Sequence, residues 1–204
     1  MNKIYRYIIA AVLVLFLGYK SIYFKKLSEV KQLDKSGFDY DAYADTLYNK
    51  GILSEDMGVG LDELMFMIQT KPDSAFSIYG NRLGIGNSAY FMVKGNGRIS
   101  AVQDGSLKVL TEKGEAVTLD SKYIFGNDLR DASRLVKLTD FKTNAEFNKV
   151  SEALNTLVRE KVIAPTVQRL REGDKISFMG ALKLNRKHLS DIEFMIIPAQ
   201  ITLQ

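Results

Sequence analysis

The order in which two hydrophobic periodicities follow one another restricts the fold of this chain most. Apolar residues keep helical spacing from Phe38 to Tyr79, β-favouring runs follow from Ala89 to Phe125, and a long helical pattern starts near Asn144. From Lys175 to Leu203 the β-favouring runs return. Because strands and helices do not alternate regularly, the order argues against a doubly wound parallel sheet. We expect an α+β fold in which the late strands complete an early antiparallel sheet, and such a sheet can close into a barrel.

Turn residues separate the expected strands. The strands are predicted at residues 89–94, 98–103, 106–111, 115–119, 122–125, 175–184, 192–197 and 200–203. Turns are predicted at Gly95-Asn96-Gly97, Asp104-Gly105 and Lys113-Gly114, since glycine, asparagine and aspartate tolerate positive φ. Pro198 cannot donate a ladder hydrogen bond, so we expect it at an edge or a bulge.

Capping residues and apolar spacing mark the helices. Three short helices are expected before the sheet, at residues 39–51, 61–68 and 73–79. Asp39 can cap the first of them and Gly51 can end it. A longer helix is expected from Asn144 to Arg171. Pro165 should break it near Ile163, because proline inside a straight helix costs on the order of 3 kcal/mol.

The first residues form an apolar segment. Residues 4–24 would span roughly 30 Å at about 1.5 Å per residue if Arg6 and Lys20 extend toward the lipid headgroups. We interpret residues 1–26 as an uncleaved transmembrane signal anchor and residues 27–37 as a stalk, ahead of a domain at residues 38–204. The alternative is a cleaved signal peptide, but no small-x-small cleavage site follows Leu17. Positive charges are nearly balanced across the segment and do not orient it.

Composition excludes several kinds of site. The chain has no cysteine and one histidine, His188, so thiolate metal sites, thiol nucleophiles and sites that need two imidazoles are excluded. Five of the 28 Lys and Arg residues lie within residues 1–26, which hold no acid, so the remainder carries 23 bases against 24 acids. A nearly neutral body gives no support for nucleic-acid binding. We expect no nucleic-acid partner, no metal and no cofactor.

Six phrases spread over the body carry a resemblance to a known family. They are Phe38–Ala44, Tyr79–Gly84, Val93–Ile99, Gly126–Ala132, Ala153–Asn155 and Gly173–Ala181. Together and in this order they resemble a bacterial family described as predicted periplasmic lipoproteins, whose genes often neighbour those of ABC-type sugar importers. The resemblance implies an extracytoplasmic, membrane-tethered domain with no assigned activity. Because the chain lacks a cysteine for lipid attachment, the apolar segment would tether it to the inner (cytoplasmic) membrane as a single-pass protein, with the body in the periplasm or outside the cell.

Polar residues after the early strands are the candidate ligand site. They are Asn127, Asp128, Arg130 and Asp131. A guanidinium offers a planar fork for a carboxylate or a sugar diol, and the neighbouring carboxylates can accept hydrogen bonds from hydroxyl groups. The alternative is an internal ion pair of Arg130 with Asp131 or Asp128 that fixes the turn after the strand.

Other motifs are interpreted as structural. Residues 79–86 are rich in glycine, but a helix precedes them and a strand follows, which reverses the context of a dinucleotide-binding loop. His188 has no nucleophile elbow to act with and is expected in a polar turn. The paired acids Asp39 and Asp41, Glu55 and Asp56, and Asp62 and Glu63 fit helix N-termini. The aromatic residues Phe38, Tyr40, Tyr43 and Tyr48 fit the core face of one helix.

These observations lead to one expected function and two alternatives. We expect a non-enzymatic accessory or binding module of an envelope solute-uptake system, with an ABC-type importer component and a small sugar as partners. The transport context comes from the resemblance. The first alternative is a structural interaction protein that binds a permease or a solute-binding protein and no small ligand. The second is a hydrolase that uses carboxylates.

Overall fold

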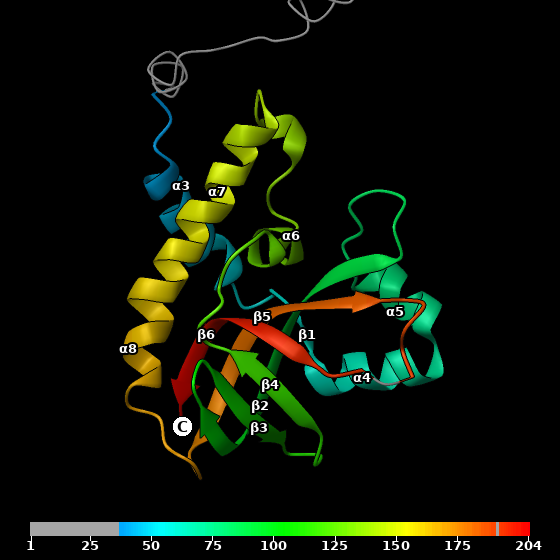
Figure 1. Ribbon diagram of the computed structural model, residues 1–204. Helices are drawn as coiled ribbons and strands as arrows, with labels where there is room; N and C mark the ends of the chain where they lie inside the picture. Colours follow the sequence, from blue (N-terminus) through cyan, green and yellow to red (C-terminus); the bar gives the residue numbers. More distant parts are fainter. Residues whose placement is uncertain (1–36, 191) are drawn as a thin grey trace, which may run out of the picture. The chain divides into compact units, whose positions relative to one another are not determined.

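A closed five-stranded barrel is the centre of the computed structural model, which describes residues 37–190 and 192–204 (Figure 1). Its strands are β2 (Ser88–Gln103), β3 (Ser106–Thr111), β4 (Ala116–Asp120), β5 (Lys175–Asn185) and β6 (Met195–Leu203). They follow the order β2-β3-β4-β6-β5, and β5 also pairs with β2, which closes the ring. β4 and β6 are parallel, and the other barrel pairs are antiparallel. The predicted α+β class and the barrel are thus confirmed.

β2 is a single long strand where two strands and a turn were predicted. Residues 88–98 pair with β5 and residues 97–103 with β3, so the strand continues without a break through residues 95–97. A Cβ atom at Gly95 would lie 2.8 Å from the Phe178 ring, and one at Gly97 would lie 2.6 Å from the Leu110 carbonyl oxygen. The two glycines therefore allow close packing between strands instead of making a turn. The predicted turn at this place was wrong.

The other turn predictions agree better with the structure. Gly105 and Gly114 have positive φ, +86° and +85°, at the predicted hairpin turns. Residues 122–125 form no strand, because the amides of Lys122 and Tyr123 donate to the carboxylate of Asp120 in a turn.

β6 is one strand where two were predicted. Pro198 pairs opposite Gly180, at the place where the register between β5 and β6 shifts. The prediction of a bulge at Pro198 is thus confirmed.

Helices cover the barrel on one side. α3 (Tyr40–Thr46) begins at Asp39, whose carboxylate accepts from the Ala42 amide, and it continues into the π-helix η1 (Leu47–Ile52). α3 packs along α7 (Asn144–Thr156) (Figure 1). The Tyr48 hydroxyl donates to the Ala199 carbonyl oxygen at 3.1 Å and thereby joins η1 to β6. The predicted core face of this first helix is present in part: Tyr48 is buried, Tyr40 and Tyr43 are partly buried, and Phe38 is exposed.

The long helix changes its hydrogen-bond pattern close to the predicted break. α7 continues as the π-helix η3 (Leu157–Ile163), and α8 (Ala164–Val167) follows with Pro165 in its first turn. Proline is tolerated there because the first amides of a helix have no partner inside it. The 3-10 helix η2 (Leu138–Asp140) precedes α7.

Two further helices lie on another side of the barrel. They are α4 (Leu61–Thr70) and α5 (Pro72–Ile78), next to the two-residue strand β1 (Val59–Gly60), which pairs in parallel with β2. The Phe76 ring of α5 meets Phe91 of β2 edge to face, with ring centres 5.1 Å apart. One short helix, α6 (Asp128–Ser133), was not predicted, and it holds most of the candidate ligand site.

The predicted anchor and stalk, residues 1–26 and 27–37, lie outside the described residues except for residue 37. Within the described part, no helix combines the length and apolar character that crossing a bilayer requires. Residues Asp39–Gln204 form one compact unit.

Candidate functional site

Arg130 and Asp131 lie side by side in the interior. Arg130 is 3% exposed and Asp131 is 4% exposed. Nε and Nη2 of Arg130 lie 2.8 and 2.7 Å from Oδ1 of Asp131, and Nη1 donates to the Phe147 carbonyl oxygen at 3.0 Å. The guanidinium carbon lies 3.4 Å from the centre of the Phe147 ring. This geometry is an internal ion pair that joins α6 to α7, and Arg130 offers no open face to a ligand.

The other two candidates are half-buried. Asn127 lines a hollow next to α7. The Asp128 carboxyl instead interacts electrostatically with the Lys183 ammonium of β5. Burial raises the pKa of the Asp128 carboxyl above its usual value, and the Lys183 ammonium opposes this shift. Burial also raises the pKa of Asp131, and its hydrogen bond to Arg130 acts in the opposite direction. Of the four predicted residues, Asn127 lines this hollow, whereas Arg130 and Asp131 are bound to each other in the interior. A ligand role for the four residues stays a prediction.

Removing the Asp128 charge is expected to stabilise the domain near neutral pH. A carboxyl whose pKa is raised by folding contributes stability below its unfolded pKa, and this contribution is lost as pH rises through the folded pKa. Asp128→Asn should therefore raise the free energy of unfolding at pH 7, and the gain should disappear near pH 4. Urea denaturation of both proteins at the two pH values measures this. Asp45→Asn, at an exposed carboxylate, is the control, and an equal gain for Asp128→Asn at both pH values would contradict the prediction.

A polar hollow of about 330 Å³ lies between residues 125–127 and the face of α7 and η3. Its main lining side chains are Phe125, Asn127, Asn148, Ser151, Asn155 and Arg159. Glu152 adds an exposed carboxylate at the rim. We call this hollow the α7 pocket.

Two side chains of the helix hold the loop that forms the opposite wall of the α7 pocket. Asn155 Nδ2 donates to the Gly126 carbonyl oxygen at 2.8 Å, and Arg159 Nη1 donates to the Ile124 carbonyl oxygen at 3.2 Å. The Arg159 guanidinium carbon also lies 4.7 Å from the centre of the Phe125 ring. These contacts hold the loop at residues 124–126 against the helix.

Ser151 lines the α7 pocket, and its hydroxyl oxygen is buried without a hydrogen-bond partner among the described residues. The residue is 4% exposed, and its Oγ is the buried side-chain polar atom without a hydrogen-bond partner among the residues that the structure describes. A helical serine usually bonds the carbonyl four residues before it, here that of Phe147. That carbonyl already accepts from Arg130. A buried hydroxyl without a partner costs about 1–3 kcal/mol, so it calls for an explanation.

Sequence reasoning missed most of the α7 pocket. Asn148, Ser151, Asn155 and Arg159 follow the spacing i, i+3, i+7 and i+11, which is one face of a helix. This polar stripe runs beside the apolar stripe that predicted the helix, and attention to the apolar residues alone left it unnoticed. The signal that would have revealed it is the pair Ser151 and Asn155, which are small polar residues close to the buried face.

The chemistry of the α7 pocket is that of binding neutral groups. Amides and hydroxyls are the commonest lining side chains, Glu152 is the carboxylate, and the Arg159 guanidinium is paired with Glu160 outside the lining. Glycoside hydrolysis uses two carboxyl groups about 5–10 Å apart, whereas Glu152 is the single carboxylate among the residues that line this pocket. Across residues 37–190 and 192–204 no three His, Asp or Glu side chains gather as metal ligands would.

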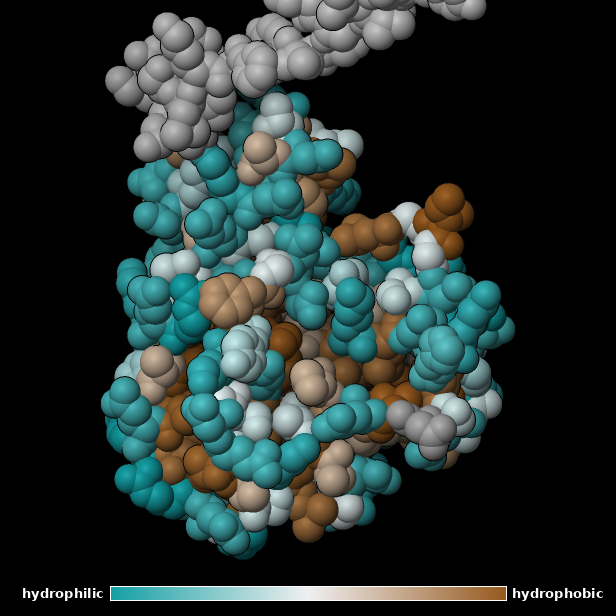
Figure 2. Space-filling view, viewed as in Figure 1, coloured by the Kyte–Doolittle hydropathy of each residue, from teal (hydrophilic) through white to brown (hydrophobic). Residues whose placement is uncertain are grey.

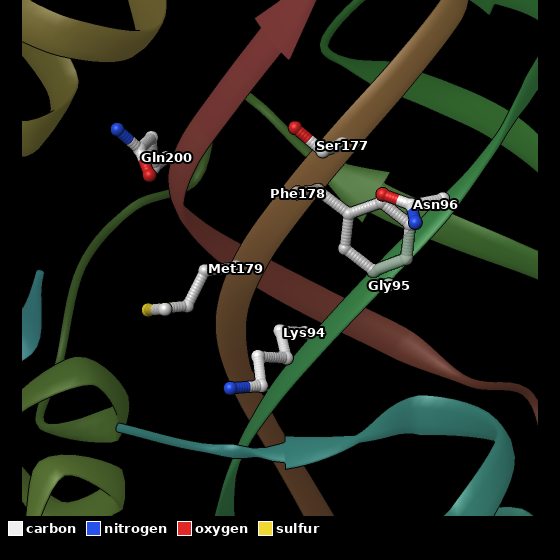
Figure 3. Close-up of a pocket in the computed structure, with 7 residues that line it drawn as sticks. All are labelled: Lys94, Gly95, Asn96, Ser177, Phe178, Met179 and Gln200. Carbon is white, nitrogen blue, oxygen red and sulfur yellow. The ribbon is translucent and has the colours of Figure 1, made fainter. Parts of the chain in front are cut away.

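A second hollow of about 380 Å³ lies on the barrel wall formed by β2, β5 and β6 (Figure 3). The Phe178 ring lies over β2 at Gly95, and Lys94 and Met179 stand beside it. Lys94 Nζ already donates to the Glu55 carbonyl oxygen at 3.2 Å, and the Asn96 Oδ1 accepts from Gln204 at 3.2 Å. Two of its polar side chains are thus engaged within the chain.

Comparisons with known proteins agree with this architecture. A crystal structure of an OB-fold protein from Thermotoga maritima MSB8 superimposes with a TM-score of 0.73, at 24% sequence identity, over 83% of this chain and all of that one. At this identity the likeness shows the fold, a five-stranded barrel. No curated protein matches the sequence. The family described as "Predicted periplasmic lipoprotein (DUF2291)" matches residues 12–202. The chain therefore belongs to this family of predicted periplasmic lipoproteins, which places it in the extracytoplasmic envelope.

Proposed function

We propose that the protein is a non-enzymatic, membrane-tethered binding module of the cell envelope that holds a small neutral sugar in the α7 pocket. The observation that carries the proposal is the buried Ser151 hydroxyl, which has no partner within the described chain. A ligand hydroxyl that displaces the pocket wall slightly gives this group its missing hydrogen bond. The family membership supports the envelope location.

The lining of the α7 pocket fits a polyol better than an ion. Amide side chains both donate and accept, as sugar hydroxyls do, so Asn127 and Asn148 can bond adjacent hydroxyl groups. Phe125 is exposed at the edge, where an aromatic face can cover the apolar C–H face of a sugar ring. A pocket of about 330 Å³ lies at the small end of the range for ligand sites, which favours a monosaccharide.

The proposed context is sugar uptake. An envelope module of this kind would act by presenting its sugar to another protein, and we propose an ABC-type importer component as that partner. In this proposal Arg130 and Asp131 do not contact the sugar. Arg130, held by Asp131, donates to the Phe147 carbonyl oxygen, so the Ser151 hydroxyl stays without that acceptor. Asn127 is the one predicted ligand residue that lines the pocket itself.

A thermal-shift screen of the full-length protein against pentoses and hexoses tests the proposal. A sugar present at 100 times its Kd should stabilise the protein by about 2.7 kcal/mol and raise the melting temperature. Ser151→Ala should leave the free protein as stable as before or slightly more stable, because it removes an unsatisfied hydroxyl. The same change should weaken sugar binding about tenfold, the effect of losing one hydrogen bond.

Ser177→Ala is the matched control, since it removes a partly buried hydroxyl from the second hollow. Its sugar-dependent shift should equal that of the unmodified protein. If no sugar raises the melting temperature, the proposal is wrong and an interaction protein without a small ligand becomes the better interpretation. If Ser151→Ala and Ser177→Ala reduce the sugar-dependent shift of the melting temperature equally, the sugar binds outside the α7 pocket.

A further inference from the structure

A loop with an apolar tip connects α5 to β2. Leu83 is 56% exposed and Ile85 is fully exposed, although both are large aliphatic residues. Figure 2 shows hydrophobic side chains gathered at a projection of the surface, and Figure 1 shows the connection between α5 and β2 extending away from the barrel. Exposed aliphatic residues at the end of a projection mark a contact surface more often than scattered single ones do.

The loop has a defined shape. At its base, Asn81 and Tyr90 exchange backbone hydrogen bonds of 2.7 and 2.9 Å. Near its tip, Arg82 Nη2 donates to the Gly86 carbonyl oxygen at 2.9 Å, and Gly84 takes a φ of +103° between the two aliphatic residues. The Arg186 amide donates to the Asn87 carbonyl oxygen and joins the loop to the β5–β6 connection. Hydrogen bonds at the base and near the tip therefore hold the loop in a defined shape, with Leu83 and Ile85 at its exposed end.

The loop at residues 81–87 carries one base, Arg82, and no acid. The sequence contains no acid between Asp73 and Asp104, and none from residue 175 to 190. Arg82 is an exposed cation within the loop, whereas Arg186, whose amide bonds Asn87 in the loop, is paired with Asp73. Aliphatic residues among cations match the boundary between anionic lipid headgroups and acyl chains.

The position of the loop indicates a bilayer as its partner. α3, which opens the domain, lies toward the same end of it as the loop in Figure 1. The stalk predicted at residues 27–37 reaches at most about 40 Å when extended, so a tethered domain stays close to the membrane. This step rests on the membrane tether in the proposed function.

We infer that residues 81–87 form a membrane-contact loop that inserts Leu83 and Ile85 into the headgroup boundary of an anionic bilayer. The insertion adds a second, reversible contact to the tether and fixes which side of the domain faces the lipid. A single shallow contact of this kind is weak by itself and becomes effective because the tether keeps the domain nearby.

The chain has no tryptophan, so a single introduced tryptophan reports its own surroundings. Full-length Ile85→Trp is reconstituted into vesicles of phosphatidylcholine and phosphatidylglycerol. Its emission should shift to the blue, and brominated acyl chains should quench most of it. Val102→Trp is the control, because Val102 is also exposed, at 46%, but lies at the opposite end of β2. Its emission should stay red-shifted and should be quenched by iodide in the water phase.

Each other outcome overturns a specific step. If the protein does not float with the vesicles, the tether in the proposed function is wrong. If it floats but Ile85→Trp responds like Val102→Trp, the tether stands and the membrane-contact loop is wrong. A blue shift that appears without lipid and grows with protein concentration assigns the loop to contact with a second copy instead. The sugar-dependent thermal shift of Ile85→Trp should equal that of the unmodified protein, which separates this loop from the α7 pocket.

Discussion

Arg130→Ala is expected to lower the free energy of unfolding by about 3–5 kcal/mol. The substitution leaves the Asp131 carboxylate buried without its cation, because both Arg130 contacts to Oδ1 are lost. It also removes the guanidinium that stacks on the Phe147 ring and bonds the Phe147 carbonyl oxygen. Urea denaturation at pH 7, followed by circular dichroism, measures the loss.

Two further variants identify the cause. The double variant Arg130→Met with Asp131→Leu replaces the buried pair by apolar side chains, and it should recover most of the lost stability. The destabilisation by Arg130→Ala should shrink toward pH 4, because burial already favours the protonated Asp131 carboxyl and loss of Arg130 favours it further. A loss below about 1 kcal/mol that does not change with pH would contradict the internal ion pair.

Gly180→Ala is expected to destabilise the domain by about 3 kcal/mol. A Cβ atom at this position would collide with the backbone carbonyl oxygen of Ile197 and with the backbone at Pro198, where the register of β5 and β6 shifts. Backbone atoms of a paired strand cannot move aside as the end of a flexible side chain can. The strain therefore weakens the pairing of β5 with β6, which is one of the strand pairs of the closed barrel.

Gly86→Ala provides the matched control for Gly180→Ala. Gly86 lies in an open loop, where the nearest atom to an added Cβ would be the backbone nitrogen of Ser88, at 4.0 Å. We expect a change within about 0.5 kcal/mol in the free energy of unfolding. If the two substitutions have equal effects in chemical denaturation, the close approach of β5 and β6 at Gly180 does not limit stability.

Much of the fold could be predicted from local patterns. Helix positions followed from apolar spacing and caps such as Asp39, and the hairpin turns followed from Asp104-Gly105 and Lys113-Gly114. The turn predicted at Gly95-Asn96-Gly97 failed for a physical reason. Glycine marks both positive φ and close packing, and only the position of Phe178, more than 80 residues later, decides between them.

The candidate site was predicted less well, because its location depends on contacts between distant segments. The sequence singled out the segment at Asn127 and Arg130, and it offered the internal ion pair as an alternative. It did not reveal that Phe147 would lie against Arg130, so that the guanidinium takes the carbonyl that Ser151 would otherwise use. That Ser151 lacks a partner thus depends on a contact between distant segments, which no local pattern records.

The pairing of β2 with β5 determines when the barrel can form during synthesis of the chain. Ser88 pairs with Asn185, so the ring is sealed by residues almost a hundred positions apart. Contacts between residues so far apart in the sequence form slowly, because the chain between them must lose conformational entropy before the contacts stabilise the fold. A partly synthesised polypeptide cannot seal the ring until its last strands exist. This delay suits a secreted protein, since threading through a translocation channel requires a chain that has not yet folded.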